Sequence, residues 1–172
     1  MRLLIMMQKL REFFFMLQLC YASRRIENGN DLLQDLSDIL STARQFNQQQ
    51  HIVGVLYYAE GHFFQCLEGE AVVVEQIFAR IAVDPRHDQV VRFSDHEVTQ
   101  AHFSEWSMKY VHKHSEISSL FKRNGLTQFM PHQLNEEQLQ EFLKILFRVE
   151  ENHDKLASAK SGYKQRGYIP YL

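Results

Sequence analysis

Apolar and polar residues alternate along the middle of the chain, over residues 53–69, which read VGVLYYAEGHFFQCLEG. Two apolar runs flank Glu60-Gly61, and the glycine favours a tight turn there. Successive side chains of a strand point to opposite faces, so Phe63, Gln65 and Leu67 are expected to share one face. The pattern predicts a β-hairpin with one glutamine among apolar neighbours.

The amide of Gln65 needs a polar partner. A buried amide has two N–H donors and an oxygen with two lone pairs, and leaving them unpaired costs about 1–3 kcal/mol. The best candidates for that partner are Tyr21 and a bound ligand.

The same two periodicities recur in the flanking segments. Alternation over residues 17–23 predicts a first strand. Apolar residues spaced three or four apart predict amphipathic helices over 31–47 and 72–82, the first ending on its core-facing side at the polar Asn47. Short strand pieces are expected over 90–93 and 97–99, and a last strand over 105–111. This order predicts an α+β sandwich of ferredoxin-like type, with two helices on one face of the sheet.

The carboxyl-terminal third predicts further helices. One short helix is expected over residues 115–123. A longer helix is expected to start at Asn135, which forms a capping pair with Gln138, and to run to residue 150. Its predicted buried stripe consists of Leu139, Phe142, Leu143, Leu146 and Val149.

These elements divide the chain into three parts. They are a weakly ordered extension over residues 1–15, a core domain over 16–112, and a helical extension with a basic tail over 113–172. Met16 directly precedes the first strand, so either Met1 or Met16 is a candidate start.

Composition excludes several classes of protein. The formal net charge of −2, from 19 basic and 21 acidic residues, argues against nucleic acid as the main partner. A secretory signal needs an uninterrupted apolar core, but Lys9, Arg11 and Glu12 interrupt the apolar start of this chain. No run of the sequence approaches the ~18 apolar residues of a membrane span. Cys20 and Cys66 are too few for a disulfide framework, which predicts buried free thiols and a reducing cytoplasm. No cysteine pair supports a zinc site.

The predicted fold brings three polar residues together. Tyr21 on the first strand, Gln65 on the third and Asn47 on the first helix are expected to converge beneath the two helices. Ile39 and Ile81 would supply apolar walls. Such a set suits a planar heteroaromatic ligand, since ligand pockets combine apolar walls with a few convergent polar groups.

Five motifs, in order, resemble those of BLUF domains, which sense blue light with a flavin. They are LCYASR around Tyr21, ARQFN ending at Asn47, FFQCLEG around Gln65, DPRH at residues 84–87 and FSEWSMK at residues 103–109. The resemblance spans residues 17–111. It implies the ferredoxin-like fold, with FAD bound non-covalently between the two helices.

The resemblance also implies roles for individual residues. Tyr21 is expected to donate an electron and a proton to the excited flavin, after which Gln65 changes its hydrogen bonding, while Asn47 holds the pyrimidine edge of the ring. Further residues expected at or near the cofactor are Ile39, Phe63, Ile81, Asp84, Arg86, His87 and Met108. Trp106 and Met108 are expected to share a strand face and to relay the change to the sheet, with either of them nearer the flavin.

The expected function is that of a short, stand-alone photoreceptor that is not an enzyme. Its output is expected to pass to a regulatory protein partner, such as a transcriptional regulator, or through self-association. Two alternatives stay open. A flavin-free interaction module is favoured by Ala43 and Phe46, which replace polar residues common in the family. An acylphosphatase-like hydrolase would need an arginine cradle, for which Arg24 and Arg25 are the weak candidates.

Overall fold

A computed structural model describes residues 15–27, 29 and 31–149. The predicted amino-terminal extension, apart from Phe15, and the basic tail lie outside these residues. So does Met1, and with it the choice between two start positions.

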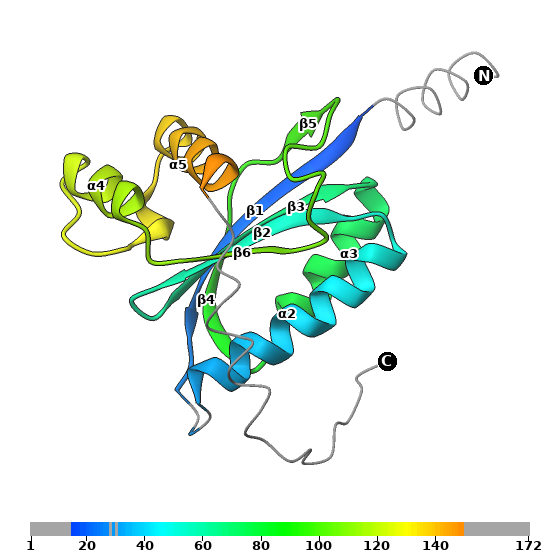
Figure 1. The fold of residues 1–172 in the computed structure, drawn as a ribbon, viewed down its shortest axis with the longest axis horizontal. Helices are drawn as coiled ribbons and strands as arrows, with labels where there is room; N and C mark the ends of the chain where they lie inside the picture. The colour runs from blue at the N-terminus through cyan, green and yellow to red at the C-terminus, as the bar shows by residue number, and fades with distance from the viewer. Residues whose placement is uncertain (1–14, 28, 30, 150–172) are drawn as a thin grey trace.

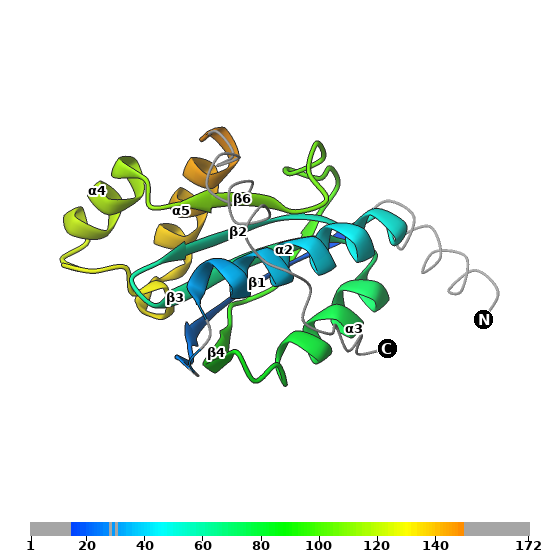
Figure 2. The same ribbon diagram turned by 60° about the horizontal axis from the view of Figure 1, so that its bottom comes forward.

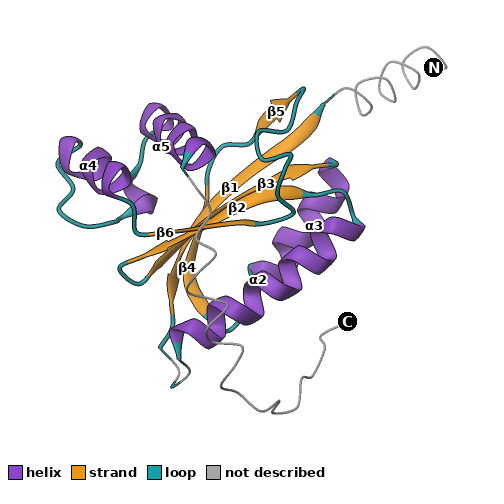
Figure 3. Ribbon diagram, viewed as in Figure 1, coloured by secondary structure: helices purple, strands orange, loops and turns teal. Residues whose placement is uncertain are grey.

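The chain forms a mixed sheet with helices on both faces (Figures 1 and 3). In chain order the elements are β1 (Met16–Arg25), α2 (Leu32–Gln49), β2 (Val53–Ala59), β3 (His62–Gly69), α3 (Ala71–Ile81), β4 (His87–Arg92), β5 (His96–Val98), β6 (Lys109–His112), α4 (Ser115–Arg123), a short 3₁₀ helix η1 (Pro131–Gln133) and α5 (Glu136–Arg148). The strand order is β4-β1-β3-β2-β6, with β5 paired to the start of β1. All pairs are antiparallel except β2 with β6. The predicted α+β sandwich is confirmed.

The central hairpin turns where the sequence predicts. Glu60 and Gly61 have φ of 50° and 80°, the positive values that a two-residue type I′ turn requires at both positions. The resulting register places Gln65 opposite Leu56 on β2 and opposite Tyr21 on β1. Gln65 therefore occupies the middle strand of the sheet.

The sheet separates two hydrophobic cores. The helices α2 and α3 cover one face, and α4 and α5 cover the other (Figures 1 and 2). Tyr21, Leu56 and Met108 lie in the core beneath α2 and α3. The second core contains the alternate strand residues, such as Tyr57 and Phe64, together with apolar residues of α4 and α5.

The stripe predicted for α5 is entirely buried in this second core, and the predicted capping box of Asn135 and Gln138 is present. None of the described helices combines the length and apolar character needed to cross a membrane.

Cys20 and Cys66 are free thiols that face each other across β1 and β3. Both are buried, as the sequence predicts.

Several strand boundaries differ from prediction, and β4, expected over residues 90–93, begins at His87. The polar residues Arg24 and Arg25 were expected in a loop, but they continue β1, because Arg24 pairs with His62 on one side and with Asp88 on the other. The last strand was expected over residues 105–111, but it covers only Lys109–His112.

The expectation that Trp106 and Met108 share a strand face is wrong. Trp106 lies in a turn before β6, where its N–H donates to the carbonyl of Phe103. Strand alternation therefore does not apply across this segment. Trp106 packs against the core under α4 and α5, whereas Met108 is buried in the core under α2 and α3.

Burial of tyrosines predicts a loss of stability at alkaline pH. Burial raises the pKa of Tyr57 to about 12, and it also raises the pKa of Tyr21, Tyr58 and Tyr110. An unfolded tyrosine ionises near pH 10, so the unfolded state loses these protons first. The free energy of unfolding should therefore be retained below about pH 10 and fall between about pH 10 and 12.

Urea unfolding at a series of pH values measures this loss. Tyr57→Phe removes one of the titrating hydroxyls and should flatten the decline. A wild-type stability that does not change across this interval would contradict the expectation.

Candidate functional site

Tyr21 and Gln65 form a buried hydrogen-bonded pair at the middle of the sheet. They are opposite residues on β1 and β3, and both point toward α2 and α3. The Tyr21 hydroxyl donates to Oε1 of Gln65 at 2.6 Å. The side chains are 4% and 3% exposed, so water does not compete for this bond. Tyr21 is thus the protein partner that the sequence predicts for the Gln65 amide.

The Tyr21 phenol is held in its neutral form. Burial raises its pKa, and the negative charge of Asp84 acts in the same direction, while Arg86 opposes them. A protonated phenol has a hydrogen to donate, which matches its observed bond to Gln65.

Met108 completes the contacts of the Gln65 amide. Nε2 of Gln65 donates to the Met108 sulphur at 3.5 Å. A thioether is a weak acceptor, and this is the bond that Nε2 makes within the described part of the chain. The amide nitrogen therefore has a further hydrogen with which to meet a ligand. Of Trp106 and Met108, it is Met108 that contacts Gln65.

Asn47 holds the segment that leads into β6. It is 1% exposed near the end of α2, and its Nδ2 donates to the Ser107 carbonyl at 2.8 Å. Arg44, one turn earlier, donates from Nε to the Met108 carbonyl at 3.0 Å. We did not predict a role for Arg44. Arg44 lies three residues before Asn47, so the two side chains share a helix face, and this spacing is the feature of the sequence that could have indicated its role.

Apolar side chains of two helices flank these polar groups. Ile39 on α2 and Ile81 at the end of α3 are both half-buried against the core that holds Tyr21, as are Ala43 and Ile77. Half-buried apolar groups facing an amide with an available hydrogen fit the faces and the polar edge of a planar heteroaromatic ring. The residues present therefore fit the flavin that the sequence motifs imply.

Phe63 and His87 lie beside this group. The Phe63 ring centroid is 4.9 Å from that of Tyr58 and 6.4 Å from that of His87. His87 Nε2 is 2.6 Å from the Ile81 carbonyl, which can only accept, so this nitrogen carries a proton. Its Nδ1 lies 2.7 Å from the hydroxyl of Ser23. His87 thus ties the end of α3 to β1, through a serine that the sequence did not single out.

Asp84 and Arg86 form an ion pair in the loop after α3. The guanidinium group of Arg86 makes three side-chain hydrogen bonds to the carboxylate, with Nε 2.9 Å from Oδ1 and 3.1 Å from Oδ2. Burial acts to raise the pKa of Asp84, but the hydrogen bonds from Arg86 outweigh it and hold this pKa below its ordinary value. Both charges lie at the end of the site, close enough to act on the Tyr21 hydroxyl.

Trp106 is the one predicted photoactive residue that the structure places elsewhere. Its ring lies over Nζ of Lys109, 4.2 Å from the ring centroid, on the side of the sheet that α5 covers. The other predicted residues line the space under α2 and α3 or the loop after α3.

Comparisons with curated proteins identify relatives of this chain. A family model described as BLUF, sensors of blue light using FAD, matches residues 16–109. The photoactivated adenylate cyclase subunit alpha of Euglena gracilis is 31% identical over 108 residues, which are 60% of this chain and 11% of that protein. The blue light- and temperature-regulated antirepressor BluF of Escherichia coli is 36% identical over 59 residues, covering 34% and 15%. The chain thus matches a small part of the length of each.

Solved structures show the same fold over more of the chain. BlsA in its photo-activated state is 45% identical, with a TM-score of 0.78 over 80% of this chain and 99% of that one. BlrB, a BLUF protein in its dark state, is 27% identical, with a TM-score of 0.64 over 77% and 96%. The motifs, the buried Tyr21–Gln65 pair and these matches lead to one conclusion: the chain belongs to the BLUF family of blue-light sensors that use FAD.

Proposed function

We propose that this chain senses blue light through Tyr21 and Gln65, acting on FAD held between α2 and α3, and passes the signal to a protein partner. The observation that carries the proposal is the buried 2.6 Å hydrogen bond from the Tyr21 hydroxyl to Gln65. This bond links two groups. The Tyr21 phenol can give up an electron and a proton, and the Gln65 amide can exchange its donor and acceptor ends by turning over.

The residues around this bond would hold the flavin ring. The amides of Gln65 and Asn47 would meet its polar edge, and Ile39 and Ile81 would cover its faces. Phe63, Met108, Asp84, Arg86 and His87 would lie at or near it. FAD, when bound, supplies the absorption of blue light and an excited state that accepts an electron.

Tyr21 is the proposed donor of the electron and the proton, and Gln65 is the group that responds. In the observed state Oε1 of Gln65 accepts from Tyr21, and Nε2 faces the Met108 sulphur. Turning the amide over would bring Oε1 to Met108. A thioether has no hydrogen to donate, so this contact would be lost and the segment entering β6 would change its support.

The proposed output is a contact with a regulatory protein, such as a transcriptional regulator, or self-association of the chain. The comparisons support a regulatory role in general terms, because one relative is a light-regulated antirepressor. The cyclase relatives are matched over a small fraction of their length, so their activity is not carried over, and we assign this chain no catalytic role. Residues 16–112 would form the sensor and the following helices the output region.

The two alternative functions receive less support. Matching to a flavin-using family does not favour a flavin-free module. A hydrolase would need arginines directed at an anionic substrate, but Arg24 is paired with Asp88 and Arg25 with the buried Asp35.

Absorption spectra of the full chain with FAD, in the dark and directly after blue light, test the proposal. We expect a flavin spectrum that shifts slightly to the red and returns in the dark. Tyr21→Phe should bind flavin and lose this cycle completely, because the phenylalanine has no proton to give. Tyr57→Phe, on the opposite face of the sheet, should cycle normally.

Other outcomes would contradict the proposal at different points. Protein that takes up no flavin would remove the proposed cofactor site. Bound flavin without a shift would leave a flavoprotein that does not use this photochemistry. A normal cycle in Tyr21→Phe would remove the tyrosine from the mechanism.

A further inference from the structure

Lys109 is a buried cation on the far side of the sheet from the Tyr21–Gln65 pair. It is 1% exposed, its Nζ donates to the Phe147 carbonyl at 2.9 Å, and the Trp106 ring lies over the ammonium group. Burying an ammonium group is costly unless hydrogen bonds and favourable charges compensate. These contacts therefore restrain the side chain to one place.

The carbonyl that Lys109 contacts belongs to the last turn of α5. The last four carbonyls of a helix have no partner within the helix, and they carry the negative end of its dipole. A cation at this end stabilises the helix terminus. Lys109 thus caps α5 from the sheet.

The residue before Lys109 lies at the flavin site. Met108 accepts from Gln65 through its sulphur and from Arg44 through its carbonyl. Met108 is buried in the core under α2 and α3, whereas Lys109 contacts Trp106 and the end of α5 on the other side of the sheet. The two contacts are separated by one peptide bond.

The strand that carries these contacts is lightly restrained. β6 has four residues and lies at the edge of the sheet, where its pairing in the described structure is with β2 alone. A shift of an edge strand disturbs one row of backbone hydrogen bonds, whereas a shift of β3 would disturb two. β6 is therefore the strand through which a change at Gln65 is most readily passed on.

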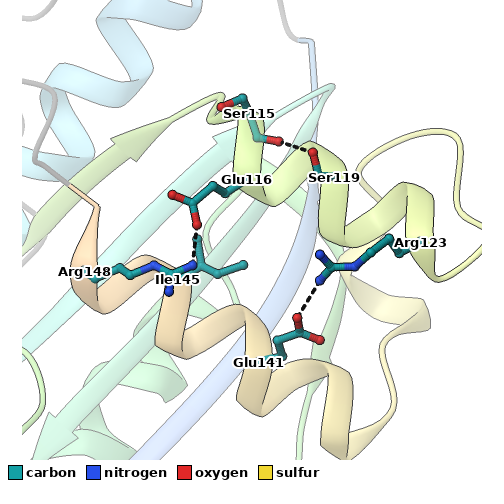
Figure 4. A pocket seen from close by; sticks show the side chains of 7 residues that line it. All are labelled: Ser115, Glu116, Ser119, Arg123, Glu141, Ile145 and Arg148. Atoms are coloured by element: carbon teal, nitrogen blue, oxygen red, sulfur yellow. Dashed lines mark hydrogen bonds and ion pairs between the residues drawn. The ribbon is translucent and has the colours of Figure 1, made fainter.

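The end of α5 is also joined to α4. Ion pairs from Arg148 to Glu116 and from Arg123 to Glu141 bridge the groove between the two helices (Figure 4). Arg148 follows directly on the residue that Lys109 caps. A displacement of that turn therefore acts on the contact between α4 and α5 as well.

We infer that Lys109 is the positioning residue that passes a displacement of Met108 to the last turn of α5, so that light releases this turn from the sheet. The inference rests on the proposed function, because it requires Gln65 to change its contact with Met108. Phe147, which is 50% exposed in this turn, would change its surroundings when the cap is released.

Hydrogen–deuterium exchange of the amides at the end of α5, in the full chain with FAD, tests the inference. In the wild type, blue light should raise the exchange rate of these amides. Lys109→Met keeps the length of the side chain but removes the cap, so its dark exchange should equal that of illuminated wild type and the light–dark difference should be lost. The light-induced flavin shift should remain.

Two further variants separate the cap from a general effect on folding. Lys109→Arg keeps a cation with N–H donors, and it should preserve the light–dark difference. Lys144→Met makes the same change at an exposed position of α5, and it should also preserve the difference. Dark exchange of amides in β2 and β3 shows whether each variant is folded.

The inference would be overturned if Lys109→Met kept the wild-type light–dark difference, or if Lys109→Arg or Lys144→Met lost it. A wild-type chain with a normal flavin shift but no change at α5 would also overturn it, and would leave the proposed function standing. Absence of the flavin shift in the wild type would instead contradict the proposed function.

Discussion

Replacing Gln65 by leucine is expected to leave flavin bound and to abolish the light-induced red shift. Leucine fills a similar volume but has no amide to turn over, so neither the bond to Tyr21 nor the contact with Met108 can be exchanged. The Tyr21 hydroxyl also loses its acceptor in a buried place, which should cost about 1–3 kcal/mol of folding free energy.

Difference spectra before and after blue light measure the shift, and urea unfolding measures the stability. Gln18→Leu is a matched control, because Gln18 is also buried but faces the other side of the sheet, where its amide donates to Glu68. It should lose stability and keep the shift. A reversible shift of normal size in Gln65→Leu would refute the role assigned to Gln65.

Replacing Phe142 by alanine is expected to destabilise the protein by about 3–5 kcal/mol, the usual cost of removing a buried aromatic ring. Phe142 is completely buried, and its ring packs against those of Tyr57, Phe64, Phe121 and Phe129. It joins α5 to the sheet and to α4 at once. A cavity at this position weakens the contact of α5 with the sheet and its contact with α4.

Urea unfolding followed by far-ultraviolet circular dichroism measures the loss. Phe147→Ala makes the same change on the same helix at a half-exposed position, and it should cost about 1 kcal/mol or less. Equal losses in the two variants would show that α5 does not contribute to a common core with the sheet.

The two hydrophobic cores contain different groups of residues. The core under α2 and α3 contains the Tyr21–Gln65 pair, and the core under α4 and α5 contains the aromatic cluster around Phe142. Because the sheet lies between them, a signal must cross a strand. The peptide that joins Met108 to Lys109 is where side-chain contacts on both faces meet.

The amino-acid sequence by itself determined the local structure and the membership of the family. The alternation over residues 53–69 placed Gln65 on the same face as Phe63, and a strand has no other way to orient these side chains. The amino-terminal cap of α5 and the apolar stripe that begins at Leu139 were equally local, since they depend on residues three or four apart. The pairing of Tyr21 with Gln65 was expected from the predicted fold and from the five motifs that resemble one family, not from the segment around Tyr21 alone.

The tertiary structure decided how the parts meet. The side of the sheet that Trp106 occupies depends on a turn closed by Phe103, and the pattern of alternation contains no information about that turn. The contacts of Arg44 and Lys109 join residues that lie 64 and 38 positions apart in the chain. Such contacts are set by the packing of helices on both faces of the sheet. A lysine is usually exposed, and Lys109 is buried because α5 packs over it.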